Sequence, residues 1–153
     1  MTSVDADASE FQPDDQDAVR SLILAGLGEH WGHIDESLNA DLADLASTYG
    51  HGRTVVFRRA GEIVATGTIV PRDESTAEIL RMSVAADQRR SGLGRLVIEE
   101  LVRTARGWGA TAVVLETSTD WNEVVSFYQS CCFAITHHEA GSFGEDTWFR
   151  REV

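Results

Sequence analysis

Residues 84–94 read Val-Ala-Ala-Asp-Gln-Arg-Arg-Ser-Gly-Leu-Gly, a polar stretch that closes on a glycine-rich turn. The pattern of residues 76–85 predicts a strand before the turn, and the apolar spacing of residues 92–108 predicts an amphipathic helix after it. A turn that opens a helix exposes free backbone N–H groups with partial positive charge, and glycine lets an anion approach them. Fixed positive charge is added by Arg89, Arg90 and Arg95. The segment therefore predicts a site for a phosphate-bearing ligand, most naturally a pyrophosphate.

Two other glycine-rich phosphate loops do not match this segment. A Walker A loop ends in Gly-Lys-Ser/Thr, and the chain contains no lysine. A dinucleotide-binding Gly-x-Gly-x-x-Gly/Ala loop needs a small residue at position 97, where the chain has Val97. Residues 107–112 match that pattern but lie between a helix and a strand, which is the wrong order, so we interpret them as a helix end. Glycine spacing alone is equally consistent with a tight turn whose arginines are solvated.

The sequence predicts further helices and strands before and after this turn. They are helices at 14–28, 36–48 and 92–108, strands at 53–59, 62–70, 76–85 and 111–117, a helix that begins at Asp120 with Glu123 in a capping box, and closing strands at 133–139 and 146–150. Hairpin strands followed by a β-α-β unit predict a mixed sheet with helices on both faces, which is an α/β (α+β) fold. We expect a disordered acidic tail over residues 1–10, apart from a very short strand near Phe11, and a single domain over residues 11–153.

Composition excludes several classes of protein. With 153 residues, of which 42% are hydrophobic, the chain can bury the core of one globular domain. No apolar run approaches the roughly 20 residues that span a bilayer, and the acidic N-terminus does not resemble a signal peptide, so a cytoplasmic protein is expected. The net charge of -12 argues against binding to nucleic acid or to a membrane surface.

Charge is unevenly distributed along the chain. Residues 1–50 contain 11 acidic residues against the single base Arg20, and all 13 basic residues of the chain are arginine. One interpretation is adaptation to a salty cytoplasm or a biased genome. The other is a functional acidic surface that attracts a cationic substrate, and the sequence does not separate the two.

Cysteine and histidine usage predicts no metal site. Cys131 and Cys132 are adjacent, no Cys-x-x-Cys or His-Glu-x-x-His spacing exists, and the five histidines are scattered. Neither cysteine has an evident histidine partner, so buried cysteines are a better interpretation than reactive thiols.

Three motifs, in this order, resemble those of the GNAT superfamily of N-acetyltransferases. Residues 78–84 resemble its central strand, and Arg89-x-x-Gly92-x-Gly94 resembles its acetyl-CoA signature. Residues 127–133 resemble its later Phe-Tyr-x-x-x-Gly-Phe segment, with Cys132 in place of the glycine. The resemblance covers roughly residues 11–150. It implies a single domain with a central mixed, mostly antiparallel sheet that is splayed at its middle and carries helices on both faces.

The same resemblance implies an activity. The chain would transfer an acetyl group from acetyl-CoA to a primary amine by direct attack in a ternary complex. The acceptor would be a small molecule or a peptide, and the acidic first third favours a cationic one. A homodimer is among the assemblies that the resemblance allows. The alternative function is a non-catalytic acyl-CoA-binding or regulatory module on the same fold.

Binding of acetyl-CoA is implied for a defined set of residues. Backbone amides from Arg89 to Arg95 would hold the pyrophosphate, and backbone groups of Met82 and Val84 would pair with the pantetheine arm. An amide near Met82 would polarise the thioester carbonyl. The family often has an asparagine seven residues before its tyrosine, whereas this chain has Asn122 one residue later. The implied set is Met82, Ser83, Val84, Arg89, Arg90, Ser91, Gly92, Leu93, Gly94, Arg95 and Asn122.

The resemblance also implies catalytic roles for Tyr128 and Glu78. Tyr128 would be the acid that protonates the departing sulfur, although residues 124–131 also form the apolar stripe of a core helix. Glu78 would be the base, and strict alternation predicts that it shares a face with Met82 and Val84, where an apolar setting makes a carboxylate a stronger base. The other interpretation of Glu78 is a strand-end residue that reaches solvent. Glu116 is a rival base.

One further segment invites two interpretations. His30-Trp31-Gly32-His33 lies between the first two predicted helices, where such folds build the acceptor wall. It would either contact an acceptor or form a polar loop with a packing tryptophan.

Overall fold

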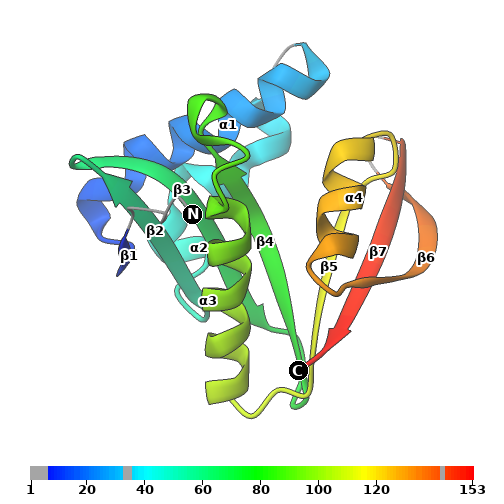
Figure 1. Ribbon diagram of the computed structural model, residues 1–153. Coiled ribbons are helices and arrows are strands. Elements are labelled where there is room, and N and C mark those ends of the chain that lie inside the picture. Colours follow the sequence, from blue (N-terminus) through cyan, green and yellow to red (C-terminus); the bar gives the residue numbers. More distant parts are fainter. Residues whose placement is uncertain (1–6, 33–35, 142–143) are drawn as a thin grey trace.

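The computed structural model describes residues 7–32, 36–141 and 144–153, and it places seven strands in one sheet in the order β1-β2-β3-β4-β5-β7-β6 (Figure 1). The strands are β1 (Asp7–Glu10), β2 (Arg53–Arg59), β3 (Glu62–Pro71), β4 (Thr76–Val84), β5 (Ala112–Ser118), β6 (Ala134–Gly141) and β7 (Gly144–Glu152). Every neighbouring pair is antiparallel except β4 with β5. The predicted mixed, mostly antiparallel sheet is confirmed.

β4 and β5 diverge in the middle of the sheet. They are paired only where residues 76–78 meet residues 112–114, and beyond this point the two strands separate (Figure 1). From Ile79 to Val84, the edge of β4 that faces β5 therefore has no strand partner among the described residues. The predicted splay is confirmed.

A β-bulge accompanies the splay. Thr68 pairs with Leu80 but Thr66 pairs with Ser83, so two residues of β4 lie opposite Gly67. One of them, Arg81, has a positive φ of 54°, a conformation that L-residues other than glycine rarely adopt. A bulge reverses the alternation of side chains along the rest of the strand, and this determines which residues of β4 share a face.

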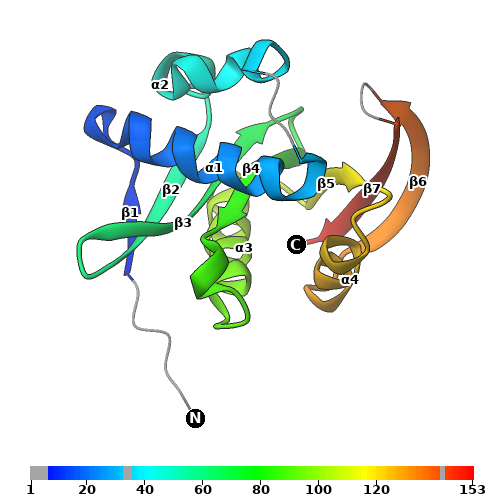
Figure 2. The same ribbon diagram turned by 90° about the horizontal axis from the view of Figure 1, so that it is seen from above.

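Helices cover both faces of the sheet (Figure 2). One face carries the 3-10 turn η1 (Pro13–Asp15), α1 (Gln16–Trp31), η2 (Glu36–Ala43) and α2 (Leu45–Thr48). The other face carries α3 (Leu93–Gly107) and α4 (Asn122–Ser130), with η3 (Ala86–Gln88) in the loop before α3. Each face has its own hydrophobic cluster, because the strands present alternate residues to the two helical layers. The predicted helices on both faces are confirmed.

The apolar stripe of α3 forms the centre of the larger cluster. Leu93, Val97, Leu101 and Ala105 repeat at four-residue intervals and are fully buried or nearly so. Leu96 fits the apolar spacing of the predicted amphipathic helix, but its side chain is exposed because it lies on the flank of the helix. No helix in the described ranges combines the length and the apolar character needed to cross a membrane.

Three helix boundaries differ from the prediction. α1 continues past residue 28 through Trp31 and ends at Gly32, whose φ of 77° closes the helix. The predicted helix over 36–48 is instead the 3-10 segment η2 and the short α2, because Asp44 caps a new start by accepting from the N–H of Ser47. α4 begins at Asn122 without the predicted capping box, since Asp120 lies inside a turn closed by a hydrogen bond between residues 121 and 118.

Both ends of the sheet are longer than predicted. Asp7–Glu10 form β1 beside β2, so these four residues of the predicted tail belong to the sheet, and Glu10 bonds Arg53 at 2.7 Å. Residues 1–6 lie outside the described residues. At the other edge, β6 and β7 pair along their whole length up to Gly141 and Gly144, where a long loop was expected.

Candidate active site

The loop between β4 and α3 carries a row of free backbone donors. Among the described residues, no backbone N–H from Arg89 to Arg95 has a hydrogen-bond acceptor. The chain turns there through two positive φ angles, 63° at Arg90 and 88° at Gly92, and Gly92 is the N-cap of α3. Donors of this kind at a helix N-terminus match a diphosphate in charge and in hydrogen bonding.

Of the three arginines predicted to add positive charge, two are held by the protein. Arg89 bonds Glu29 at 2.6 and 3.1 Å, and this hydrogen bond lowers the pKa of Glu29. Arg95 donates to the carbonyl and the hydroxyl of Ser130, each at 3.2 Å. Arg90 has no hydrogen bond or ion pair with the described part of the chain. It borders a cavity of about 490 Å³ lined by Arg90, Asn122, Glu123 and Ser126.

Gly94 lets the start of α3 approach α4. A Cβ at this position would lie 2.9 Å from the ring of Phe127, closer than real Cβ atoms come to a neighbour. Leu93 anchors the same turn because its side chain is almost fully buried, and Ser91 donates from Oγ to the carbonyl of Gln88. The two glycines of the motif therefore have different tasks: Gly92 supplies the turn and Gly94 supplies the close contact.

The end of β4 presents its residues to two different layers. Met82 and Val84 pack against the cluster under α3, and Met82 lies against Gly67 and the α3 layer. Ser83 points to the other face, where its hydroxyl donates to the carbonyl of Leu22 in α1. The backbone of this segment forms the unpaired edge described above, which is the position that the sequence predicted for the pantetheine arm.

Glu78 does not share a face with Met82 and Val84, so the prediction from strict alternation is wrong. Its neighbours Ala77 and Ile79 point into the cluster under α3, and Glu78 therefore points to the opposite face. The reason is the bulge at Arg81, which inserts one residue between Glu78 and Met82 and shifts the phase. Glu78 and Met82 consequently approach the open edge of β4 from opposite sides.

Tyr128 is a core residue whose hydroxyl also reaches the proposed thioester site, so the structure is compatible with both interpretations of it. It is buried, and its ring packs on those of Phe133 and Phe149 in the core. Its hydroxyl lies 3.9 Å from Sδ of Met82, beside the open edge of β4. Burial raises the pKa of Tyr128, so the hydroxyl stays protonated at neutral pH and is able to donate a proton.

Two carboxylates face the space on the other side of that edge. Glu78 is largely buried, with 18% of its side chain exposed, and burial raises its pKa while Arg72, at 3.9 Å, opposes the rise. Loss of solvent raises the pKa of Glu116, and the charges of Asp146 and Glu78 add to this effect. A raised pKa makes both groups stronger bases than a solvated carboxylate, so the geometry keeps Glu78 and Glu116 as rivals.

An ion pair that no sequence motif predicts anchors the bulge. Arg81 donates to both carboxylate oxygens of Asp41 at 2.8 and 2.6 Å, and Tyr49 donates to the same carboxylate at 2.5 Å. Burial, together with the charge of Asp41, raises the pKa of Tyr49 to about 12. These contacts join η2 and the turn after α2 to the one strained residue of β4. No motif connects residues 41, 49 and 81 along the chain.

The segment His30–Trp31 is the last turn of α1 and not a loop, because the helix runs on to Gly32. His30 stacks on Trp121 with ring centroids 4.3 Å apart, and Trp31 contacts the edge of His30 at 4.5 Å. Since Trp121 is the N-cap of α4, this stack joins the end of α1 to the start of α4 across the splay. His33, which the sequence grouped with these residues, lies outside the described residues.

Neither cysteine sits in a nucleophilic setting. Cys131 is buried beside Tyr128, and burial raises the pKa of its thiol. Cys132 is exposed and has a φ of 70°, so it adopts the left-handed conformation that suits the glycine usual in this motif. The substitution keeps the local backbone and adds some strain.

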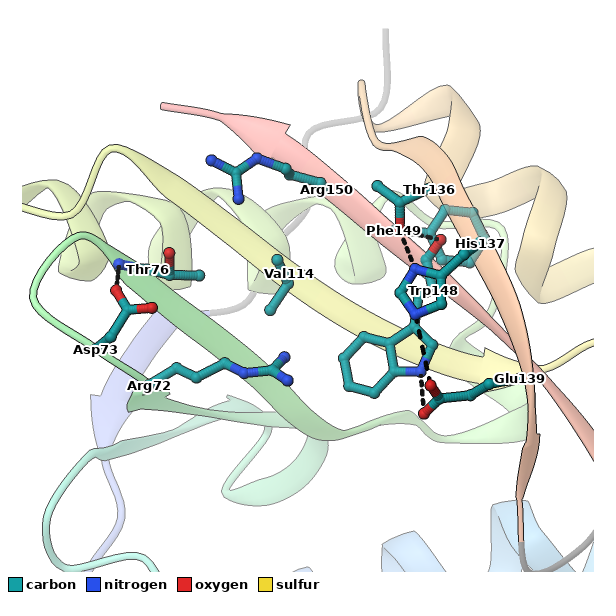
Figure 3. A pocket seen from close by; sticks show the side chains of 10 residues that line it. All are labelled: Arg72, Asp73, Thr76, Val114, Thr136, His137, Glu139, Trp148, Phe149 and Arg150. Carbon is teal, nitrogen blue, oxygen red and sulfur yellow. Dashed lines mark hydrogen bonds and ion pairs between the residues drawn. The ribbon is translucent and has the colours of Figure 1, made fainter.

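Trp148 of β7 forms a second cluster on the face that carries Glu78 (Figure 3). The guanidinium of Arg72 lies 4.9 Å from the Trp148 ring centre, and the His137 ring is stacked nearly parallel to the indole at 5.9 Å. These residues border a cavity of about 350 Å³. No sequence motif singled out Arg72 or Trp148, although alternation in β7 does place Trp148 on the face opposite that of the buried Phe149.

Comparison with known proteins gives a family match. Residues 16–133 match the model of the acetyltransferase (GNAT) family. The chain is 29% identical over 113 residues to N-acetyltransferase family 8 member 2 of Rattus norvegicus, which covers 69% of this chain and 50% of that protein. It is 30% identical over 131 residues to an IAA acetyltransferase of Azospirillum brasilense, covering 84% and 82%. The chain spans about half the length of the rat relatives that it matches.

Solved structures share the fold over nearly the whole chain. A GNAT-family acetyltransferase from Staphylococcus aureus Mu50 superposes with a TM-score of 0.86 at 15% identity, covering 96% of this chain and 98% of that one. A GNAT-family acetyltransferase from Elizabethkingia anophelis, solved with acetyl-CoA bound, gives 0.76 at 16% identity, covering 99% and 100%. At these identities the likeness establishes the common fold.

Proposed function

Because the chain belongs to the acetyltransferase (GNAT) family, we propose that it is an N-acetyltransferase that moves an acetyl group from acetyl-CoA to a primary amine in a ternary complex. One observation carries the proposal. The unpaired edge of β4 leads directly into a loop whose backbone N–H groups, from Arg89 to Arg95, have no acceptor among the described residues. An extended arm that ends in a diphosphate is complementary to both features at once.

The residues around this edge fit the donor substrate. Backbone amides from Arg89 to Arg95 would hold the diphosphate, and Arg90 and Asn122 would flank it across the cavity that they line. Backbone groups of Met82 and Val84 would bond the pantetheine arm, and Ser83 would hold the strand to α1. Acetyl-CoA supplies the activated acyl group, and the amide near Met82 would polarise its carbonyl.

The two faces of β4 divide the proton transfers between them. The amine would arrive on the face of Glu78, which would accept a proton as the new C–N bond forms, either directly or through water. Tyr128 lies on the other face and would give its proton to the sulfur as the C–S bond breaks. One proton is thus taken up on the acceptor side and one is delivered on the donor side.

Acidic residues of the first third have structural partners. Arginines from the rest of the chain pair with four of them: Glu10 with Arg53, Asp15 with Arg58, Asp41 with Arg81 and Glu29 with Arg89. These pairs join the N-terminal elements to the sheet and to the phosphate loop. They give the acidic bias a role in the fold, so a cationic acceptor remains a prediction that rests on the unpaired acids alone.

Release of coenzyme A across a panel of amines, followed by the mass of the product, tests this function. We expect a product 42 Da heavier than one class of amine, which is the mass of an acetyl group replacing a proton, at about 1–10³ turnovers per second. Tight binding of acetyl-CoA with no turnover on any amine would overturn the proposal in favour of an acyl-CoA-binding module.

A further inference from the structure

The face of the sheet opposite α4 holds a cavity that the proposed chemistry does not use. Its volume is about 350 Å³, within the range of small-molecule sites, and it lies over β5, β6 and β7 beside the start of β4 (Figure 3). Val114 forms part of its floor and is the register partner of Glu78. Glu78 does not line the cavity itself, but its carboxylate lies 3.9 Å from Arg72, which does.

Among the described residues, the guanidinium of Arg72 has N–H groups without a hydrogen-bond acceptor. Its side chain is 48% exposed, its closest anionic atom is Glu78 Oε1 at 3.9 Å, and its guanidinium makes no hydrogen bond to the described residues. The guanidinium carbon lies 4.9 Å from the centre of the Trp148 ring, a cation–π contact that helps to position it. The N–H groups of this guanidinium are therefore available to a ligand. A carboxylate fits them best, because its two oxygens accept two parallel hydrogen bonds from a guanidinium.

The other charged groups of the wall are already engaged. Asp73 accepts from the N–H groups of Ser75 and Thr76, and Glu139 accepts from Nε1 of Trp148 at 2.9 Å. Arg150 donates to Glu152 at 2.7 Å and lies on the far side of the cavity from the indole (Figure 3). Arg72 is therefore the arginine of this wall whose guanidinium has no hydrogen bond to the described residues and lies beside the indole.

Arg72 and Glu78 place a positive and a negative group side by side. An α-amino acid carries its amine and its carboxylate about 3 Å apart, through a single Cα. The separation of 3.9 Å between Arg72 Nη1 and Glu78 Oε1 matches that spacing with the charges reversed. The rings of Trp148 and His137 then offer an aromatic surface for the side chain of the same molecule.

Building on the proposed function, we propose that the acceptor is an α-amino carboxylate with a bulky or aromatic side chain. Its amine lies at Glu78, its carboxylate bonds the guanidinium of Arg72, and its side chain occupies the cavity over Trp148. Arg72 and Trp148 are thus specificity-determining residues of the acceptor site, and Arg72 excludes acceptors that lack the carboxylate.

Matched acceptor pairs test this assignment. The pairs are L-phenylalanine with phenethylamine and L-tryptophan with tryptamine. L-Phenylalaninamide is a third case, in which a neutral carboxamide replaces the carboxylate. For the wild-type protein we expect kcat/KM to favour the carboxylate member by about tenfold to hundredfold, since one bidentate charge-assisted contact distinguishes the two. Arg72→Met should remove this preference, and Arg72→Lys should restore part of it.

Arg150→Met is the matched control, because it removes an equal charge from the same wall. We expect it to change the preference by less than about twofold. Arg72→Met should also raise the pH at which the acid limb of kcat/KM falls, because Arg72 opposes the raised pKa of Glu78. Melting temperature and acetyl-CoA affinity report whether each variant is folded.

The outcomes separate this inference from the proposed function. Turnover of amines with no preference for carboxylates, or a preference that survives Arg72→Met, overturns the inference and leaves the proposed function standing. Better turnover of phenethylamine and tryptamine overturns it in favour of a cationic acceptor. Acetyl-CoA binding without turnover of any amine overturns both. The preference of the wild-type protein for acceptors with a carboxylate is measured without any variant, so the inference can be tested even if a variant does not fold.

Discussion

The two faces of β4 are built from differently distributed residues. On the side of α3 and α4, the groups that we assign to acetyl-CoA come from one continuous stretch, 82–95, and from one helix. On the opposite side, the acceptor face that we propose draws on Arg72, Glu78, Glu116 and Trp148, which lie in separate parts of the chain. The donor site is a local property of the sequence, whereas the acceptor site exists only after the chain has folded.

The largest expected effect lies on the donor side. Tyr128→Phe keeps the ring that packs on Phe133 and Phe149 and removes only the hydroxyl beside Met82. We expect kcat to fall by about 10²–10⁴, with acetyl-CoA affinity nearly unchanged. Steady-state kinetics and calorimetry measure the two quantities. An unchanged kcat would remove Tyr128 from the mechanism and leave it as a core residue.

On the acceptor side, replacing each carboxylate separates the two rival bases. We expect Glu78→Gln to lower kcat by about a hundredfold and Glu116→Gln by less than about tenfold. A base must be deprotonated, so activity is present above its pKa and lost as the pH falls through it. Burial raises the pKa of Glu78, so the acid limb of the pH profile should lie above the ordinary range of glutamate.

Glu78→Gln should abolish that acid limb, because an amide does not titrate. The reverse order of the two variants, with the larger loss for Glu116→Gln, would make Glu116 the base.

A smaller effect is expected at the contact between α3 and α4. Gly94→Val introduces carbon atoms where a Cβ alone would lie 2.9 Å from the Phe127 ring. The start of α3 must move, so we expect the Kd for acetyl-CoA to rise by about tenfold to hundredfold. Gly107→Ala, in the last turn of the same helix, has no heavy atom within 4 Å of its new Cβ and is the control. An unaltered Kd for Gly94→Val would show that this close approach is not required.

The smallest effect concerns the bulge between the two faces. Gly tolerates the φ of 54° at position 81 and Ala does not, so Arg81→Ala should be about 1 kcal/mol less stable than Arg81→Gly, the reverse of the usual order within a strand. Denaturant unfolding measures the difference. Equal stabilities, or a more stable Ala variant, would mean that the bulge relaxes without Arg81.

Asp41→Asn tests the anchor of the same bulge. Burial raises the pKa of Asp41, but hydrogen bonds from Arg81 and Tyr49 outweigh it and hold the pKa below its ordinary value. A lowered pKa contributes stability above the ordinary pKa, and this is lost as the pH falls through the folded-state value. We expect a loss of about 1–3 kcal/mol at pH 7 that shrinks towards pH 3. A loss independent of pH would point to packing and not to charge.

Prediction from sequence succeeded where the signal is local. The turn at residues 84–94, the stripe of α3 and the neighbouring strands β2 and β3 are each marked by residues close together in the chain, and all of them are present. The face of Glu78 was predicted wrongly because one inserted residue, Arg81, changes the phase of the strand without any sequence signature. The contact between Arg72 and Trp148 has no sequence signature, because it joins the loop after β3 to β7 on the other side of the splay.

The splay between β4 and β5 also affects how the two sides of the sheet are held together. β4 and β5 share a register over residues 76–78 alone, and beyond this point the strands β1–β4 and β5–β7 are joined by side-chain packing in the cluster under α3. On the proposed mode of binding, the pantetheine arm supplies hydrogen-bond partners to the edge of β4 along residues 79–84. Departure of coenzyme A must then break the same hydrogen bonds, so each turnover ends with this edge of β4 exposed to solvent again.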